Sequence, residues 1–251
     1  MKIKKYLIIF IIFISIFIFS IPSIASIEQK SIKSQKFANL VVFIDFKDTD
    51  HTKHQKTSLK GCFNDNEKDT FKFFDGKDGY ERSLKIYLNK ISYGQFELVN
   101  IFPQYNENTG KIVTYKAKNN RAFYENSPDI LISEVAQDLK SSGKIGNDVI
   151  LDYNNDKCID NFTMVIADDD AQSGGTSFKA NFGGSISING TSIASYNLLT
   201  ESSAYGSLKE SSVIIHEFLH TLGYPDLYRG GNDSGLPIGT WDIMSATHYM
   251  V

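Results

Sequence analysis

One segment near the end of the sequence constrains the fold more than any other. Six of the ten residues 213–222 are large and apolar, and this density of apolar side chains predicts a buried helix. Ser207 and Glu210 form a capping box that predicts the helix start. Gly223 follows the last apolar residue, where a left-handed residue can end a helix, and Pro225 prevents the helix from resuming. The segment therefore predicts a buried helix followed by a sharp turn.

Polar residues on this helix form the pattern HExxH: His216, Glu217 and His220. Residues four apart lie one turn apart on the same face, so both imidazoles can bind one Zn²⁺ ion. Glu217 neighbours the first histidine and is placed to act as a general base toward a water molecule. The pattern alone also occurs on ordinary surface helices. In a buried helix, however, unpaired polar groups cost about several kcal/mol, and a metal ion with its water would satisfy all three side chains.

Asp226 is the predicted third zinc ligand. No glutamate follows Glu217 in the sequence. The remaining downstream candidates are Asp226, Asp233, Asp242 and His248. Of these, Asp226 alone follows the predicted turn at a short, fixed spacing. The alternative is that Asp226 only caps the turn after Pro225.

A second pattern, WDIMS at residues 241–245, follows the glycine-rich stretch 229–239. Met244 in this pattern is predicted to lie on a tight turn. A methionine there can provide a soft apolar support beneath a metal site. Without the preceding zinc pattern, the same residues would indicate an ordinary apolar turn.

Together, HExxHxxGxPDLY and WDIMS resemble the immune-inhibitor-A-like secreted bacterial metallopeptidases, a metzincin-related family. The likeness covers about residues 38–248, and only the zinc region is specific; residues 39–46 and 83–94 resemble the family's first strand and the helix after it. The resemblance implies His216, His220 and Asp226 as zinc ligands, Glu217 as the base and Met244 as the Met-turn residue. It also implies more chain after the Met-turn, so a truncated C-terminal lobe is expected. By analogy, the strand 193–196 is predicted as the sheet edge that pairs with an extended substrate.

The N-terminal residues predict export. Lys2, Lys4 and Lys5 precede the apolar run 6–21, and a small-residue cleavage site ends at Ala25. We therefore expect a signal peptide at 1–25, a polar linker at 26–37 and a metallopeptidase catalytic domain at 38–251. The protein is expected to be secreted, with membrane contact only through the signal segment. A retained anchor is the alternative.

Charge and cysteine content limit the partners. The net charge is −3, and removal of the three lysines in residues 1–25 makes it −6. An acidic chain without a basic stripe argues against nucleic acid and leaves protein or peptide substrates as the expected partners. Cys62 and Cys158 could form one disulfide after export, and the sequence leaves this open.

The pattern of apolar residues predicts an α+β fold. The predicted strands are 40–46, 95–102 and 162–167, and the predicted helices are 81–91 and 128–141. Residues 185–188 and 191–196 flank Asn189 and Gly190, a strong hairpin signal. We expect a metzincin-like zinc-peptidase domain, in which the active-site helix packs on a mixed twisted sheet.

Oxygen-bearing side chains at alternate positions suggest a second metal site. Asp152, Asn154, Asp156 and Asp160 are spaced as in a calcium loop. Lys157 stands where such loops usually have glycine, and Thr163 stands where they have glutamate. The segment is therefore a candidate Ca²⁺ site, and the alternative is a polar turn between strands.

The predicted activity is that of a secreted zinc-dependent endopeptidase, with a metal-activated water and Glu217 as the general base. The alternative, from another class, is a secreted non-catalytic zinc-binding or interaction module derived from such a peptidase and truncated after the Met-turn.

Overall fold

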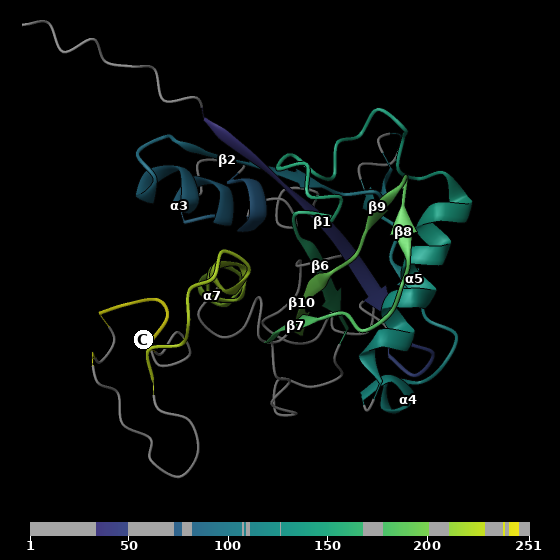
Figure 1. Ribbon diagram of the computed structural model, residues 1–251. Coiled ribbons are helices and arrows are strands. Elements are labelled where there is room, and N and C mark those ends of the chain that lie inside the picture. Colours follow the sequence, from purple (N-terminus) through teal and green to yellow (C-terminus); the bar gives the residue numbers. More distant parts are fainter. Residues whose placement is uncertain are drawn as a thin grey trace, which may run out of the picture. The chain divides into compact units, whose positions relative to one another are not determined.

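Pairing of parallel strands organises the molecule, shown as a computed structural model in Figure 1. The structure describes residues 34–49, 73–76, 82–106, 108, 111–125, 127–167, 178–200, 211–228, 238 and 241–245. All of these belong to one compact unit, Ser34–Val251. The predicted signal peptide, most of the predicted linker and Cys62 lie outside the described residues.

The main sheet has the strand order β2-β1-β6-β10-β7, and β5 also pairs with β1. Its strands are β1 (Gln35–Asp45), β2 (Phe96–Ile101), β5 (Tyr115–Lys116), β6 (Phe162–Ile166), β7 (Phe178–Asn181) and β10 (Ser195–Thr200). All pairs are parallel except the one between β10 and β7. The sheet is therefore mixed, with one antiparallel strand at its edge.

Strand β1 is central and is buried from Phe37 to its end. Strands covered on both faces are expected to be continuously apolar, as residues 40–44 are. Alternate side chains point to opposite faces, so Leu40 and Val42 belong to one core cluster, and Val41 and Phe43 belong to the other.

Helices cover both faces of the sheet (Figure 1). On one face lie α4 (Arg121–Glu125) and α5 (Pro128–Ser142), and α5 contributes Leu131, Ile132, Val135, Ala136 and Leu139 to the core. On the other face lie α3 (Leu84–Ile91) and α7 (Ser212–Thr221), which share a cluster with alternate residues of the strands. In this arrangement α7 packs against the sheet and shares a core cluster with α3, and its residues 214–219 are buried.

Short strands complete the fold. Strands β3 (Tyr105–Asn106) and β4 (Lys111–Ile112) form one antiparallel pair. Strands β8 (Ser187–Ile188) and β9 (Thr191–Ser192) form the predicted hairpin. Its turn residues, Asn189 and Gly190, have φ of 49° and 84°, as a two-residue hairpin turn with both central residues at positive φ requires.

The predicted α+β class with a mixed sheet is confirmed, and several boundaries differ from prediction. Strand β1 begins at Gln35, within the predicted linker 26–37, because its first residues already pair with β2. Helix α3 begins at Leu84 rather than at residue 81, because the Ser83 hydroxyl accepts the Ile86 N–H and caps the helix.

The predicted substrate edge at 193–196 was wrong. Strand β10, which begins at Ser195, is hydrogen-bonded to β6 on one side and to β7 on the other. Its backbone groups are therefore already paired within the sheet. Among the described strands, β7 forms this edge.

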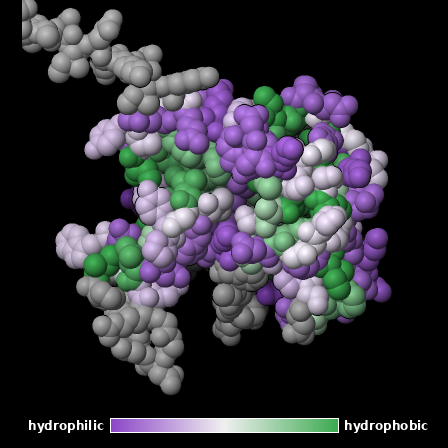
Figure 2. Space-filling view, viewed as in Figure 1, coloured by the Kyte–Doolittle hydropathy of each residue, from purple (hydrophilic) through white to green (hydrophobic). Residues whose placement is uncertain are grey.

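On the face shown in Figure 2 the described surface is mostly polar, and apolar side chains gather over α3. Ile91, the last residue of α3, is half exposed. Most large apolar side chains are buried in the two clusters instead. Within the described part of the chain, no helix has the length and apolar character needed to cross a membrane.

Candidate metal centre

Helix α7 ends in a geometry that turns the chain back on itself. Gly223 has φ of 91°, the left-handed conformation predicted for it. Its N–H donates to the carbonyl of His220, and the N–H of Tyr224 donates to the carbonyl of Leu219, which together form a Schellman motif. The turn places residues after position 223 beside the helix that they follow.

The start of α7 differs from prediction. The helix begins at Ser212 with Ser211 as its N-cap, and the predicted capping box, Ser207 and Glu210, lies outside the described residues. The Ser211 hydroxyl donates to the carbonyl of Arg82 and makes no capping bond. This bond joins the start of α7 to the segment that precedes α3.

Both histidines of the motif have one ring nitrogen bound to a backbone carbonyl. Nδ1 of His216 lies 2.9 Å from the oxygen of Ile243, and Nδ1 of His220 lies 2.8 Å from the oxygen of Tyr224. A carbonyl only accepts, so each Nδ1 carries the hydrogen. In the neutral rings each Nε2 is then left with a free lone pair, which is the form of histidine that binds metals.

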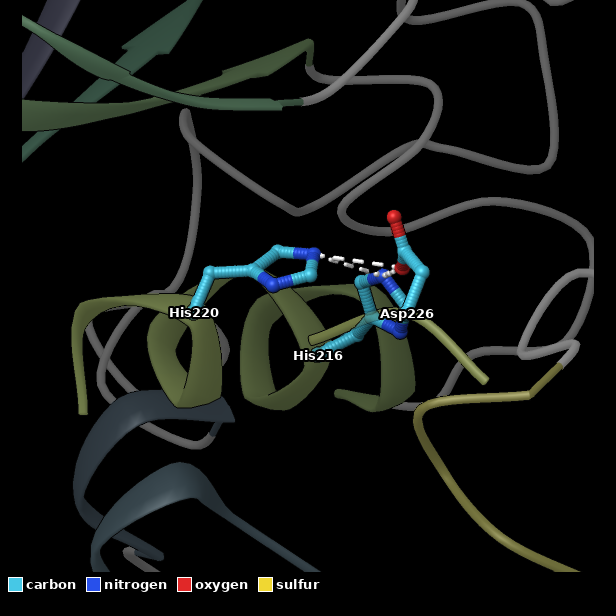
Figure 3. A group of neighbouring side chains, drawn as sticks. All are labelled: His216, His220 and Asp226. Carbon is cyan, nitrogen blue, oxygen red and sulfur yellow. Dashed lines mark hydrogen bonds and ion pairs between the residues drawn. The ribbon is translucent and has the colours of Figure 1, made fainter. Parts of the chain in front are cut away.

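The free nitrogens face each other and one carboxylate oxygen (Figure 3). The Nε2 atoms of His216 and His220 are 3.2 Å apart. Asp226 Oδ1 lies 3.1 Å from His216 Nε2 and 3.3 Å from His220 Nε2. Within the described residues, these three side chains form the one group of its kind whose ligand atoms all lie within 4.8 Å of one another. The structure therefore brings together the three residues predicted as zinc ligands.

The spacing of the three atoms suits a zinc ion. Ligands about 2.0–2.1 Å from a tetrahedral Zn²⁺ ion lie about 3.3–3.4 Å from one another. Three lone pairs at these distances repel unless a cation or protons lie between them. A donor set of two imidazoles and one carboxylate is also typical of zinc sites that keep an open position for chemistry.

The centre is buried on one side and open on the other. The His216 side chain is 7% exposed, whereas those of His220 and Asp226 are 19% and 39% exposed. Solvent can therefore reach the three ligand atoms from the side of Asp226. A purely structural zinc site would be closed by a fourth protein ligand.

Glu217 is buried beside the centre and does not join the three ligand side chains. Burial, followed by the negative charge of Asp226, raises the pKa of the Glu217 carboxyl to about 7. The Lys179 N–H, which donates to this carboxyl, acts to lower its pKa. A carboxyl with a pKa near neutrality can both accept and return a proton. The bond to Lys179 also ties Glu217 to strand β7.

The predicted Met-turn is closely joined to the centre. The N–H of Met244 donates to Asp242 Oδ1, and the carbonyl of Met244 accepts the N–H of Leu227. Its side chain is buried among the apolar residues of α3 and α7. The preceding carbonyl, that of Ile243, is the partner of His216. The turn therefore supports both the first histidine and the segment that carries Asp226.

Tyr228 is a site residue that the sequence analysis did not assign. Its ring stacks on that of His216 at 6.4 Å between centroids, and its side chain is hydrogen-bonded to the Asp226 carboxylate. Burial, followed by the negative charge of Asp226, raises the pKa of the Tyr228 hydroxyl, so it stays protonated and donates. The pattern PDLY, which ends at Tyr228, is the sequence signal that could have identified this residue.

The candidate calcium residues form a tight polar turn. Asp152 accepts the N–H groups of Asp156 and Lys157, Asn154 accepts that of Asp156, and Asp156 accepts that of Cys158. Lys157 has φ of 71°, where calcium loops usually have glycine. The carboxylates of Asp152, Asp156 and Asp160 do not converge as the side chains of His216, His220 and Asp226 do. The calcium site therefore stays a prediction.

Asp160 is set apart from the rest of this turn by burial. Its Oδ2 accepts the N–H groups of Ala38 and Tyr153, and so joins the turn to β1. Its Oδ1 is buried without a hydrogen-bond partner among the described residues, and burial raises the pKa of this carboxyl. The nearby Cys158 is a free thiol.

No protein-family model matches this sequence, and no curated protein sequence matches it significantly. The geometry of the centre therefore carries the functional argument.

A first prediction concerns the turn after α7. Gly223→Ala places a side chain at φ of 91°, which costs about 1–2 kcal/mol. Gly143→Ala is a matched control, because Gly143 has φ of 63° at the end of α5 and an added Cβ has open space in both cases. We expect both variants to unfold at similarly lowered temperatures. Only Gly223→Ala should also weaken zinc binding, measured by competition with a chelator. Equal zinc affinities in the two variants would contradict this.

Proposed function

We propose that this protein is a secreted zinc-dependent endopeptidase related to the metzincins, exported by a signal peptide at 1–25. The observation that carries the proposal is the convergence of three ligand atoms, two imidazole nitrogens and one carboxylate oxygen, 3.1–3.3 Å apart, with a buried glutamate beside them. Hydrogen bonds to backbone carbonyls orient both histidines. Without a cation or protons between them, the lone pairs of these three atoms repel one another. A zinc ion between them would be bound by all three.

The chain supplies the proton transfers. Glu217 accepts a proton from the attacking water and returns it to the leaving amine, for which a pKa near neutrality is suitable. The zinc ion, held by His216, His220 and Asp226, supplies Lewis acidity toward the water and the scissile carbonyl. The Tyr228 hydroxyl orients the Asp226 carboxylate by donating to it.

Strand β7 is the proposed substrate platform. It is the edge strand of the described sheet, and its residue Lys179 bonds to Glu217 through the backbone. An extended peptide that pairs with the outer side of β7 would therefore run close to the general base. The peptide's backbone supplies affinity in this mode, and side-chain pockets supply specificity.

The direct test is cleavage of casein by the mature protein, with and without a zinc chelator. We expect cleavage that the chelator abolishes and that added Zn²⁺ restores. An inactive protein that binds one zinc ion would favour the non-catalytic zinc-binding module instead. A protein that binds no zinc would rule out both functions.

A further inference from the structure

A network of buried and partly buried polar side chains crosses the sheet beneath α7. It consists of Asn39, Asn100, Asn161, Thr163, Asn197 and Thr221. Four of these residues lie on strands β1, β2, β6 and β10, Asn161 directly precedes β6, and Thr221 is the last residue of α7. Buried parallel strands are expected to be apolar, so a row of amides and hydroxyls at this position needs an explanation.

The first half of the network joins three strands. Asn39 Nδ2 donates to Asn100 Oδ1 at 2.8 Å, and the two residues are register partners in β1 and β2. Asn39 Oδ1 accepts from Asn161 Nδ2 and from the Thr163 hydroxyl, both at 2.8 Å. Asn39 and Asn161 are fully buried. The amide groups of Asn39 and Asn161 therefore depend on their neighbours rather than on water.

The second half reaches the metal-binding helix. Asn161 Oδ1 accepts the Thr221 hydroxyl at 2.9 Å and Asn197 Nδ2 at 3.2 Å. Asn197 Nδ2 also lies 3.3 Å from the Thr221 oxygen, which can accept from it. Thr221 directly follows His220, a proposed zinc ligand. The network therefore ends one residue from the centre.

Apolar packing alone does not determine the exact position of α7. Its side chains Ile214, Phe218 and Leu219 select which face of the helix meets the sheet, but hydrophobic burial is non-directional. Hydrogen bonds have narrow distance and angle ranges, and in a buried network they act together. The two bonds at Thr221 therefore constrain the rotation and the axial position of the last helical turn, together with the other hydrogen bonds along α7.

We propose that Thr221 is a positioning residue, which anchors the end of α7 to Asn161 and Asn197 and thereby sets His220 and the turn to Asp226 in the geometry that binds zinc. The anchoring role follows from the hydrogen bonds, whereas the role in zinc binding rests on the proposed function. Thr221 itself does not touch the metal or the substrate.

The test compares Thr221→Val, which has the same shape without the hydroxyl, with Thr221→Ser, which keeps the hydroxyl. Val135→Ala on α5 is a stability control, because it opens the core on the opposite face of the sheet. Zinc affinity is measured by chelator competition, and amide hydrogen exchange is followed at Leu222, Gly223 and Tyr224 in the metal-free protein. These three N–H groups bond to the last carbonyls of α7.

For Thr221→Val we expect about tenfold weaker zinc binding, the usual size of an effect from an outer residue, and faster exchange at the three amides. Thr221→Ser and Val135→Ala should match the native protein in both measurements. Native exchange rates at these amides in Thr221→Val would overturn the anchoring role. Faster exchange with unchanged zinc affinity would overturn the role in metal binding.

The outcomes also separate this inference from the proposed function. If the native protein binds no zinc, the proposed function fails, and hydrogen exchange still decides whether Thr221 anchors the helix. If Thr221→Val does not fold, Thr221→Ala, which leaves room for a water molecule beside Asn161, replaces it in both measurements.

Discussion

Glu217→Gln should reduce casein cleavage by at least about 100-fold and leave zinc binding unchanged. General acid–base catalysis contributes about 10²–10⁴-fold to rates, and an amide at this position can neither accept nor return a proton. Glutamine has nearly the shape of glutamate, and Glu217 is not among the three side chains that converge on the proposed ion. The measurements are the cleavage rate and the zinc content of the purified variant.

Glu97→Gln is the matched control for this variant. Glu97 lies on β2, close to half exposed, in an ion pair with Lys36, so the same chemical change there should alter neither measurement. Cleavage at the native rate by Glu217→Gln would exclude Glu217 as the base. Loss of zinc together with activity would instead assign it to metal binding.

Asp226→Ala is expected to weaken zinc binding by at least about 100-fold. The substitution removes one of the three proposed zinc ligands, whereas loss of an outer partner alone typically costs 10–100-fold. It also leaves the Tyr228 hydroxyl without the carboxylate to which it donates. Chelator competition measures the affinity, and zinc content after dialysis checks it.

Asp138→Ala provides the comparison for the loss of a carboxylate. Asp138 lies on α5 and pairs with Lys144, remote in sequence and on the other face of the sheet from α7. Its removal should leave zinc affinity at the native value. Unchanged affinity in Asp226→Ala would remove Asp226 from the ligand set and favour its role as a simple turn cap.

The sequence was most informative where one residue type has one structural use. Gly223 and Pro225 predicted the end of α7, because few other residues tolerate a positive φ or prevent a helix from continuing. The spacing of His216 and His220 predicted their convergence, because helical geometry is fixed. Asn189 and Gly190 predicted the hairpin for the same reason.

Features that depend on distant contacts were not predictable in the same way. The predicted start of α7 was wrong. Ser207 and Glu210 match a local capping pattern, whereas the helix begins at Ser212. The predicted substrate edge was also wrong. Strand β10 pairs with a neighbour on both sides, and sequence order does not reveal such pairing. The carbonyls that orient the two histidines belong to Tyr224 and Ile243, and backbone groups leave no trace in a pattern of side chains.

The bond between the Lys179 N–H and Glu217 has a consequence for how such a site could diversify. The group that positions the glutamate belongs to the backbone of β7, and every residue type except proline supplies it. If the proposed endopeptidase activity is correct, side chains along β7 can therefore be exchanged, and the choice of peptide altered, while Glu217 keeps its position. Substrate preference and chemistry would then change independently on the same short strand, with proline at position 179 as the one substitution that affects both.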